Sequence, residues 1–394
     1  MRQATASVHA GLAPAVPGQP VLSPLALATS FHAHPDEVNF SATALNAAAP
    51  HFYGRWGNPS AEAPEERLAE LDAGEAAVVF ASGMVAVSAL FLTTLKAGDH
   101  LVLSDVCYAG VAELAHHTLP RLGVEVTAVD TSQVEEVAAA LRPNTRLVHV
   151  ETPANPILRL ADIAAIAGKA HERGVELSVD GTMATPIATQ PIALGADYVV
   201  HSLTKYACGH GDALGGAVIG RREAMANLRK EALIHLGGAL NPFAAWLILR
   251  GLETLPLRMA AHQSGAAAVA AFLEKSPRIR RVFWPGLPSH PQHALARRQM
   301  RNFSGIIAFS ASEGPELARR LADQLELVAY AVSLGKTRSL VFYIPTDDII
   351  GPSFHLAGPA AERYRAWAGD GVFRLSVGIE DPADLIEDLA QALA

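Results

Sequence analysis

A lysine that follows a buried strand is the residue of this chain best placed for covalent chemistry. Lys205 stands just after the apolar run ADYVVHS, in the segment HSLTKYACGHGDALGG, between hydroxyl side chains and a glycine-rich turn. A primary amine held at the end of a strand can form a Schiff base with a carbonyl group. Most lysines after a strand point into solvent, so this pattern alone leaves both interpretations open.

Polar side chains also follow the neighbouring predicted strands. Asp180 ends ELSVD, Asn155 follows LVHVET, and Tyr108 follows LVLS. The Asp180 carboxylate could pair with a protonated pyridine nitrogen, which lets a pyridinium ring store electrons, or it could cap the turn that follows it. The Tyr108 ring could stack on a planar cofactor while its hydroxyl reaches a substrate amine. The alternative for Tyr108 is a half-buried core residue.

Two segments contain groups suited to a phosphate. Ser82, Gly83 and Met84 stand at a predicted strand-to-helix turn, where the backbone N–H groups of a helix N-terminus favour a dianion. Small residues are also frequent at such turns for steric reasons. The segment YGRWGNPS places Tyr53 and Arg55 among turn-forming residues, and an arginine can bind a phosphate through two parallel hydrogen bonds.

One arginine lies inside an apolar predicted strand. Arg374 occurs in VFRLSVGIED, where an unpaired charge would be expensive to bury. It therefore needs an anion. A substrate carboxylate would serve, although a structural salt bridge is the commoner reason for an arginine in a strand.

The elements that position these residues alternate between strands and helices. The predicted strands are AAVVF, DHLVLSD, VEVTAVD, TRLVHVET, VELSVD, ADYVVHS and GGAVIG, with helical segments such as IAAIAGKAHERG between several of them. This order is typical of an α/β fold in which a mostly parallel sheet has helices on both faces. Ligands bind beyond the carboxyl ends of such strands, where the residues above converge.

The chain is predicted to divide into three regions. Residues 1–62 are rich in Pro, Ala and Gly and predict an arm that reaches a neighbouring subunit. Residues 63–250 form the domain that binds the cofactor, and residues 251–394 form a smaller C-terminal α+β domain. NPFAAWLILRGLETLPLRM predicts one long helix at the boundary, and IIAFS, LVAYAVSLG, SLVFYI and VFRLSVG predict strands beyond it.

The composition excludes several classes of protein. The chain has 394 residues, 50% of them hydrophobic and 18% charged, which fits a well-packed enzyme. Its net charge of -8 argues against nucleic acid as a partner. The uncharged run 76–95 could cross a bilayer by length, but Ser82 and Gly83 divide it into a strand and a helix, so we expect no membrane partner.

Cysteine and histidine usage adds two expectations. Two cysteines and an N-terminus without an apolar core predict a cytoplasmic protein. Among 16 histidines, no helix-spaced ligand pair is joined to a glutamate base, so no metal is predicted.

Taken together, these segments resemble the Cys/Met-metabolism PLP-dependent enzymes, a family that includes cystathionine γ-synthase and γ-lyase, methionine γ-lyase and the homoserine-ester sulfhydrylases. HSLTKYACGHGDALGG is similar to the lysine segment of that family, YGRWGNPS to its arm motif and ASGM to its phosphate turn. ETPANP, VDGTMATP, SLGKTRSL and RLSVGIED are similar to its ring-binding and carboxylate-binding segments. The resemblance implies the PLP-dependent transferase fold type I and pyridoxal 5'-phosphate (PLP) as the cofactor.

The resemblance also implies individual roles and an assembly. The catalytic residues would be Lys205, which holds PLP as a Schiff base, and Tyr108. A dimer would be the catalytic unit, paired further into a tetramer, because the arm binds the cofactor phosphate of the adjacent subunit. The implied cofactor-binding residues are Tyr53, Arg55, Ser82, Gly83, Met84, Tyr108, Asn155, Asp180, Ser202, Thr204 and Lys205. The implied substrate-binding residues are Ser333, Arg374 and Arg338.

The chain departs from the family pattern mainly on the substrate side. Gly110 stands where methionine γ-lyases often have a cysteine, and Arg338 replaces a glutamate of the γ-synthases and γ-lyases, a feature closer to sulfhydrylases. YIPTDDIIGPSFHL replaces the usual histidine-containing segment. In it, Asp347 and Asp348 could form a solvated turn or could face a cationic side chain such as the guanidinium-like end of canavanine. Gly181 replaces an asparagine, which should not harm cofactor binding.

The predicted function is γ-elimination on a sulfur-containing or related γ-substituted amino acid, such as methionine, cystathionine or a canavanine-like compound. The alternative is γ-replacement, as in cystathionine γ-synthase or an O-acylhomoserine sulfhydrylase. A catalytically inactive PLP-binding homologue is a third hypothesis. The joint presence of Lys205, Asp180, Tyr108 and Arg374 argues against it, because a protein that only binds PLP has no use for the substrate-side residues.

Overall fold

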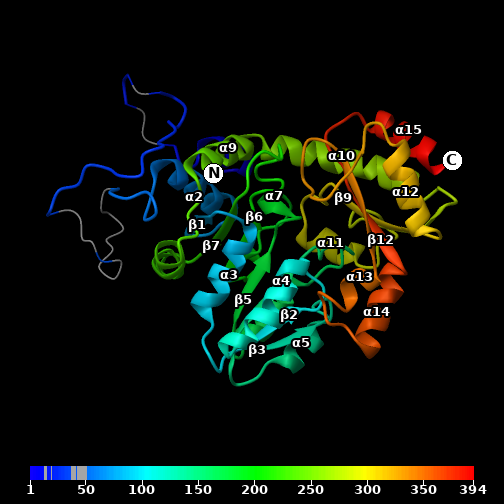
Figure 1. Cartoon of the computed structure of the whole chain (residues 1–394), viewed down its shortest axis with the longest axis horizontal. Helices are drawn as coiled ribbons and strands as arrows, with labels where there is room; N and C mark the ends of the chain where they lie inside the picture. Colours follow the sequence, from blue (N-terminus) through cyan, green and yellow to red (C-terminus); the bar gives the residue numbers. More distant parts are fainter. Residues whose placement is uncertain (13–15, 19, 37–40, 42–50) are drawn as a thin grey trace.

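Two β-sheets lie beside each other in the computed structural model, and the strands of the first sheet lie between residues 76 and 220 (Figure 1). The structure describes residues 1–12, 16–18, 20–36, 41 and 51–394. The remaining parts of the predicted arm lie outside the described residues.

The first sheet has seven strands in the order β1-β7-β6-β5-β4-β2-β3. β7 is antiparallel to both β1 and β6, and the other neighbours are parallel. The mostly parallel sheet of the predicted α/β fold is therefore confirmed. The strands are β1 (Ala76–Phe80), β2 (His100–Ser104), β3 (Glu125–Val129), β4 (Thr145–Glu151), β5 (Glu176–Asp180), β6 (Tyr198–Ser202) and β7 (Gly216–Gly220).

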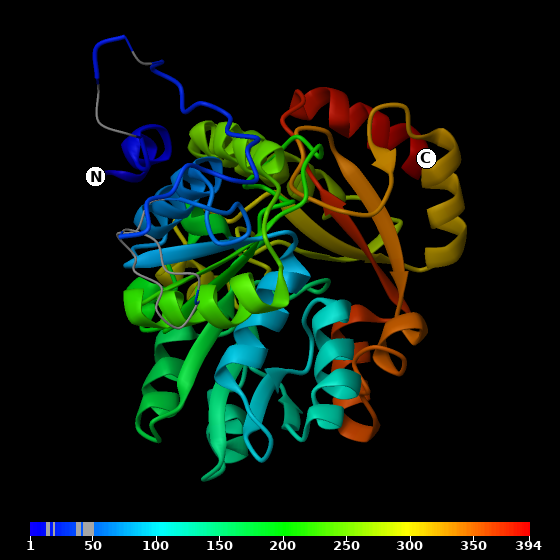
Figure 2. The ribbon, with the colours of Figure 1, turned by 60° about the vertical axis from the view of Figure 1, so that its left-hand side comes forward.

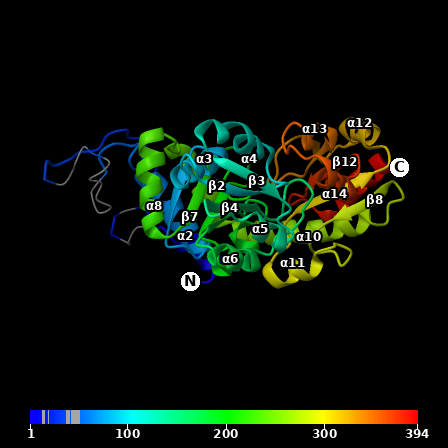
Figure 3. The same cartoon turned by 90° about the horizontal axis from the view of Figure 1, so that it is seen from below.

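Helices cover both faces of this sheet because its strands are apolar on both sides. Val78 and Val200 pack with α3 and α8, whereas Val79 and Val199 pack on the opposite face with α2 and α9. Figure 3 shows α3 and α4 on one side of the strands and α2, α5 and α6 on the other. The helices of this half are α2 (Pro59–Leu71), α3 (Gly83–Thr94), α4 (Ala109–Glu113), α5 (Val134–Ala140), α6 (Ile163–His171), α7 (Thr185–Ala188), α8 (Arg222–Leu228) and α9 (Pro242–Glu253), with π-helical turns η2 (Leu114–Thr118) and η5 (Arg229–His235).

The second sheet has five strands in the order β10-β11-β12-β9-β8, antiparallel except for the pair β10 and β11. It packs with α10, α12 and α15 around Phe309 and Phe373. The elements of this half are α10 (Leu255–Leu273), β8 (Ile279–Phe283), α11 (His293–Gln299), β9 (Ile306–Ala311), α12 (Gly314–Gln324), β10 (Ala329–Tyr330), β11 (Leu340–Pro345), α13 (Asp347–Ile350), α14 (Gly358–Ala368), β12 (Gly371–Ser376) and α15 (Pro382–Leu393).

Three details of the C-terminal half differ from the sequence prediction. The prediction of a single long helix is wrong, because α9 ends at Glu253 and a separate helix, α10, begins at Leu255. The chain breaks here because Pro256 has no N–H and fits only the first turn of a new helix. The predicted strand LVAYAVSLG is paired only at Ala329–Tyr330, and its remainder is irregular. Strand β8 was not predicted.

The N-terminal segment is only partly extended. Helix α1 (Gln3–His9) packs against the body, where Gln3 donates a hydrogen bond to the Pro186 carbonyl. The described part that follows extends away from the body on the side opposite α15 (Figure 2), and Ser30 forms an isolated bridge with Tyr53. The predicted boundaries at 62/63 and 250/251 fall within α2 and α9, and the three-region division stays a prediction.

Candidate active site

Lys205 lies in a turn just beyond β6, at the carboxyl edge of the first sheet. Its Nζ donates a hydrogen bond to Ser333 Oγ at 3.0 Å. Burial first, and then the positive charges of Arg374 and Lys336, lower the pKa of Lys205 to about 8. An amine with this pKa is partly neutral near physiological pH and can attack a carbonyl carbon.

The N-terminus of α3 and Ser202 form one cradle beside this lysine. Ser82 caps the helix by accepting a hydrogen bond from the Val85 N–H at 3.2 Å. A Cβ added to Gly83 would lie 2.8 Å from Ser202 Cβ and 2.9 Å from its Oγ, so only glycine allows this approach. Such a cradle of N–H groups and a hydroxyl suits a phosphate. The Thr204 hydroxyl, also predicted to contact the phosphate, is instead engaged within the protein, where it accepts a hydrogen bond from the Gly215 N–H at 3.1 Å.

Two predicted ring-binding residues flank the space above the strand ends. Tyr108 is 50% exposed, and a Cβ at Gly110 would lie 3.0 Å from its ring and 3.2 Å from Met84 Sδ, which places those two side chains together. Asp180 is buried at the end of β5, and its Oδ1 accepts a hydrogen bond from the Thr182 N–H at 2.9 Å. Burial raises the pKa of Asp180. A nearby cation would therefore stabilise its charged form.

The second sheet supplies the residues that suit a carboxylate. Arg374 on β12 donates to Asn155 Oδ1 at 2.7 Å and to the Ser333 carbonyl at 3.2 Å. Its Nε is buried and has no hydrogen-bond partner among the described residues. Ser333 has a φ of 90°, a left-handed conformation that costs a non-glycine residue energy and is concentrated at functional sites. An anion at Arg374 would supply the missing partner.

Sequence reasoning missed Glu151, the last residue of β4. Its Oε2 accepts a hydrogen bond from the Tyr108 N–H at 2.6 Å, and its Oε1 accepts one from the Asn155 N–H at 2.8 Å. Burial, and then the charge of Asp180, raise the pKa of Glu151. The available signal was a carboxylate at the end of the apolar run TRLVHVE, where an unpaired charge is costly. Through these two hydrogen bonds, the Glu151 side chain holds the segment after β2 next to the segment after β4.

Other residues singled out in the sequence have contacts of their own or are exposed in the described part of the chain. The Arg55 guanidinium lies 5.4 Å from the Tyr53 ring and donates to the Ile234 carbonyl at 2.5 Å. Arg338 is exposed on the segment before β11. Asp347 begins α13 and forms an ion pair with Arg365 of α14, which favours the solvated structural interpretation of the DDIIG segment.

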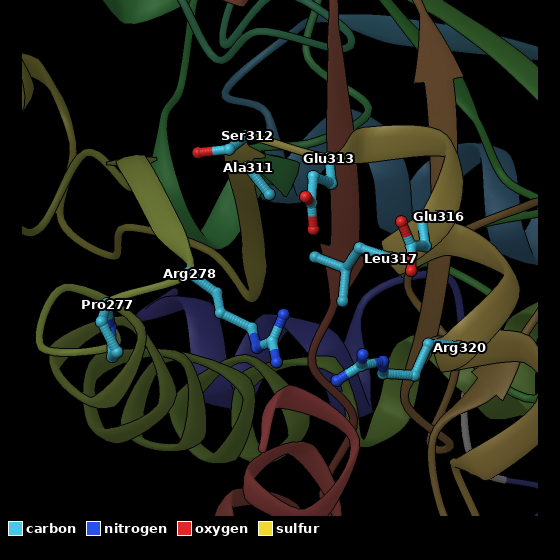
Figure 4. Close-up of a pocket in the computed structure, with 8 residues that line it drawn as sticks. All are labelled: Pro277, Arg278, Ala311, Ser312, Glu313, Glu316, Leu317 and Arg320. Atoms are coloured by element: carbon cyan, nitrogen blue, oxygen red, sulfur yellow. The ribbon is translucent and has the colours of Figure 1, made fainter.

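A separate pocket lies on the second sheet, between the ends of β8 and β9 and helix α12 (Figure 4). Its Arg278 and Arg320 both donate to the Ala394 carbonyl oxygen, at 2.6 and 3.0 Å. These two cations are therefore engaged by the C-terminal helix, and the pocket contains none of the predicted site residues. Across the described ranges, no group of three or more His, Cys, Asp or Glu side chains is arranged to hold a metal ion.

The strand-end residues fit one kind of cofactor. An amine with a lowered pKa, a phosphate cradle, an exposed aromatic ring and a carboxylate converge at the carboxyl edge of one α/β sheet. A planar aldehyde that bears a phosphate and a ring nitrogen uses each of these groups. The fold and this set of groups define a PLP-dependent enzyme of fold type I.

The comparisons with known proteins give the family: the chain belongs to the Cys/Met metabolism PLP-dependent enzymes, whose pattern matches residues 4–394. A canavanine gamma-lyase of Pseudomonas canavaninivorans is 40% identical over 393 residues, 99% of this chain and 96% of that protein. An O-succinylhomoserine sulfhydrylase of Pseudomonas aeruginosa is 41% identical over 362 residues, 89% of this chain and 87% of that protein. The crystal structure of cystathionine gamma-lyase from Lactobacillus plantarum complexed with L-serine has a TM-score of 0.88 and 32% identity, and the match covers 100% of this chain and 98% of that one.

These matches confirm the predicted family, fold class and PLP cofactor. They also support the predicted kind of enzyme, because the relatives at 40–44% identity are γ-lyases for methionine, canavanine and cystathionine and an O-succinylhomoserine sulfhydrylase. In the part of the chain that the structure describes, the helices are too short or too polar to traverse a bilayer.

Proposed function

We propose that this chain is a γ-lyase that removes a sulfur or other heteroatom substituent from Cγ of an amino acid. One observation carries the proposal. Ser333 accepts a hydrogen bond from Lys205 Nζ through its hydroxyl and one from Arg374 through its carbonyl, at 3.0 and 3.2 Å. A single strained residue therefore fixes the distance between the base and the carboxylate anchor. Such fixed geometry suits repeated proton transfers on one bound amino acid.

Each residue has a defined part in this reaction. Lys205 would hold PLP until the substrate amine takes its place, and the bound cofactor would then supply a ring that accepts electrons from the substrate Cα. The Lys205 amine freed by this exchange removes the proton from Cα, passes it on, and then removes one from Cβ, while the Cγ substituent leaves with the electrons of its bond. The Tyr108 hydroxyl exchanges a proton with the substrate amine or the leaving group. Arg374 binds the substrate carboxylate and satisfies its buried Nε, while Asp180 keeps the ring nitrogen protonated.

The remaining cofactor contacts follow from the cradle and the arm. Gly83, Met84 and Ser202 hold the phosphate at the N-terminus of α3. Tyr53 and Arg55 complete the phosphate site of a second copy of the chain, which makes a dimer the catalytic unit and leads to a tetramer of two dimers. The support is the exposed position of both side chains and their distance in sequence from the strand-end residues. Arg338, exposed on the segment before β11, contributes to substrate selection.

The substrate class is an L-amino acid with a thioether or comparable leaving group at Cγ. Methionine, cystathionine and canavanine represent this class, and the γ-lyase relatives support it. The pairing of Asp347 with Arg365 removes the reason for a cationic preference at that segment. The sulfhydrylase relative and Arg338 favour the second candidate, γ-replacement on an activated homoserine ester.

The test is an assay of the PLP-loaded protein against methionine, cystathionine, canavanine and O-acetyl- and O-succinylhomoserine, with and without a thiol. Oxo acid and amino-acid products are followed separately, with Lys205→Ala as the control for cofactor chemistry. Oxo acid or homoserine formed without a thiol supports the γ-lyase. A thioether formed only from an ester and a thiol would replace it with γ-replacement. No product from any compound would indicate the inactive homologue.

A further inference from the structure

A buried ion pair lies beneath the carboxyl edge of the first sheet. His201 on β6 is 4% exposed, and its Nε2 lies 2.9 Å from Oδ2 of Asp72, which follows α2 and is 0% exposed. The second oxygen, Asp72 Oδ1, is buried and has no hydrogen-bond partner among the described residues. A carboxylate buried in this way needs a cation beside it, since an unpaired buried charge is strongly unfavourable. The imidazolium form of His201 supplies that cation.

A second histidine of the same sheet shows what the carboxylate changes. His149 on β4 is also buried, but its Nδ1 lies 2.8 Å from the neutral Ser178 hydroxyl. Burial lowers the pKa of His149 to about 4. Burial acts on His201 in the same direction, yet its pKa is raised because Asp72 and then Asp180 favour the charged form. The pKa values of two buried histidines in one sheet are therefore shifted in opposite directions.

The His201 imidazole lies close to Gly181, the residue that follows Asp180. β5 and β6 are neighbours, and Asp180 pairs with Val200 in the register. A Cβ at Gly181 would lie 3.0 Å from His201 Cε1, so the glycine leaves room for the imidazole directly below the turn that carries Asp180. Burial raises the pKa of Asp180, and the hydrogen bonds from Thr182 and then the positive charge of His201 act in the opposite direction.

We propose that the Asp72–His201 pair is a positioning element that keeps Asp180 ionised, so that Asp180 can hold a proton on the ring nitrogen of PLP. This inference rests on the proposed role of Asp180. It assigns a function to two residues that do not touch the cofactor. Negative and positive charges then alternate from the Asp72 carboxylate to the His201 imidazolium, the Asp180 carboxylate and the pyridinium ring of PLP. Each charge stabilises the opposite charge beside it.

The test measures binding and not turnover. The full-length chain is freed of PLP, and the dissociation constants of PLP and of its 1-deaza analogue, in which the ring nitrogen is a C–H group, are compared. Wild type should prefer PLP. Asp72→Asn and His201→Gln should each reduce that preference about tenfold, the lower end of the effect of losing a partner that orients a directly binding group. The affinity for the deaza analogue should stay the same, because that compound has no proton for Asp180 to hold.

Two further variants make the test specific. His149→Gln changes another buried histidine, which among the described residues has no carboxylate partner, and it should leave the preference for PLP unchanged. Added to Asp180→Asn, His201→Gln should cause no further loss of preference. An equal loss of affinity for both compounds in His201→Gln, or no loss for either, would overturn the proposal. These outcomes do not depend on which reaction the enzyme catalyses, so they are separate from a failure of the proposed γ-lyase function.

Discussion

The two halves of the site are constructed in different ways. On the cofactor side, Asp180 ends β5, Asn155 follows β4 and Lys205 follows β6, so the regular sheet itself brings them together. On the substrate side, Arg374 lies within a strand, but its partner Ser333 is on an irregular segment with a φ of 90°. The cofactor side can therefore be inferred from strand patterns. The substrate side depends on a conformation that the pattern does not encode.

The largest effect should come from the cofactor side. Lys205→Ala removes the amine that binds PLP and transfers protons, so we expect turnover to fall by at least about a thousandfold, in the range of general acid–base catalysis. The absorbance of the bound cofactor should also change, because the Schiff base with the protein is lost. The control is Lys336→Ala, which should keep that absorbance. Equal turnover by Lys205→Ala and wild type would contradict the assignment.

A smaller effect is expected when the substrate side is altered. Arg374→Ala leaves the substrate carboxylate without its partner, so KM should rise about a hundredfold, as for a buried charge that loses its counter-ion. PLP affinity should stay close to that of wild type, because Arg374 contacts Asn155 and Ser333 and not the phosphate cradle. Steady-state kinetics and a PLP titration measure the two quantities. If Arg374→Ala lost affinity for PLP while KM stayed unchanged, Arg374 would belong to the cofactor side of the site and not to the substrate side.

The smallest effect is expected on the pKa of Lys205, the residue that bonds to Ser333 where the cofactor and substrate sides meet. With a pKa of about 8 for Lys205, the rate at which the cofactor-free protein captures PLP should rise with pH and level off above this value. The charge of Lys336 lowers the Lys205 pKa, so Lys336→Ala should move the midpoint to higher pH. Stopped-flow absorbance across a pH series gives both midpoints. A midpoint that moves to lower pH would contradict the assigned electrostatic influence.

The sequence allowed the fold and most strand-end residues to be predicted because both depend on local apolar periodicity. Glu151 and the pair of Asp72 and His201 were missed, since their partners are distant in the chain and are brought close only by folding. The break at Thr254 was missed because apolar residues continue through α9 and α10. The cytoplasmic location, the dimer and tetramer, and the individual site roles stay predictions.

The antiparallel strand β7 has a consequence for how the protein folds. β6 ends at Ser202 and β7 begins at Gly216 beside it, so the segment that contains Lys205 is a short connection between paired strands and not a long crossover. Closing such a loop costs less chain entropy than closing the crossovers elsewhere in the sheet. The backbone that carries the reactive lysine is therefore fixed by contacts of low sequence separation, which are the contacts that fold quickly, whereas its Nζ bonds to Ser333, a residue 128 positions away.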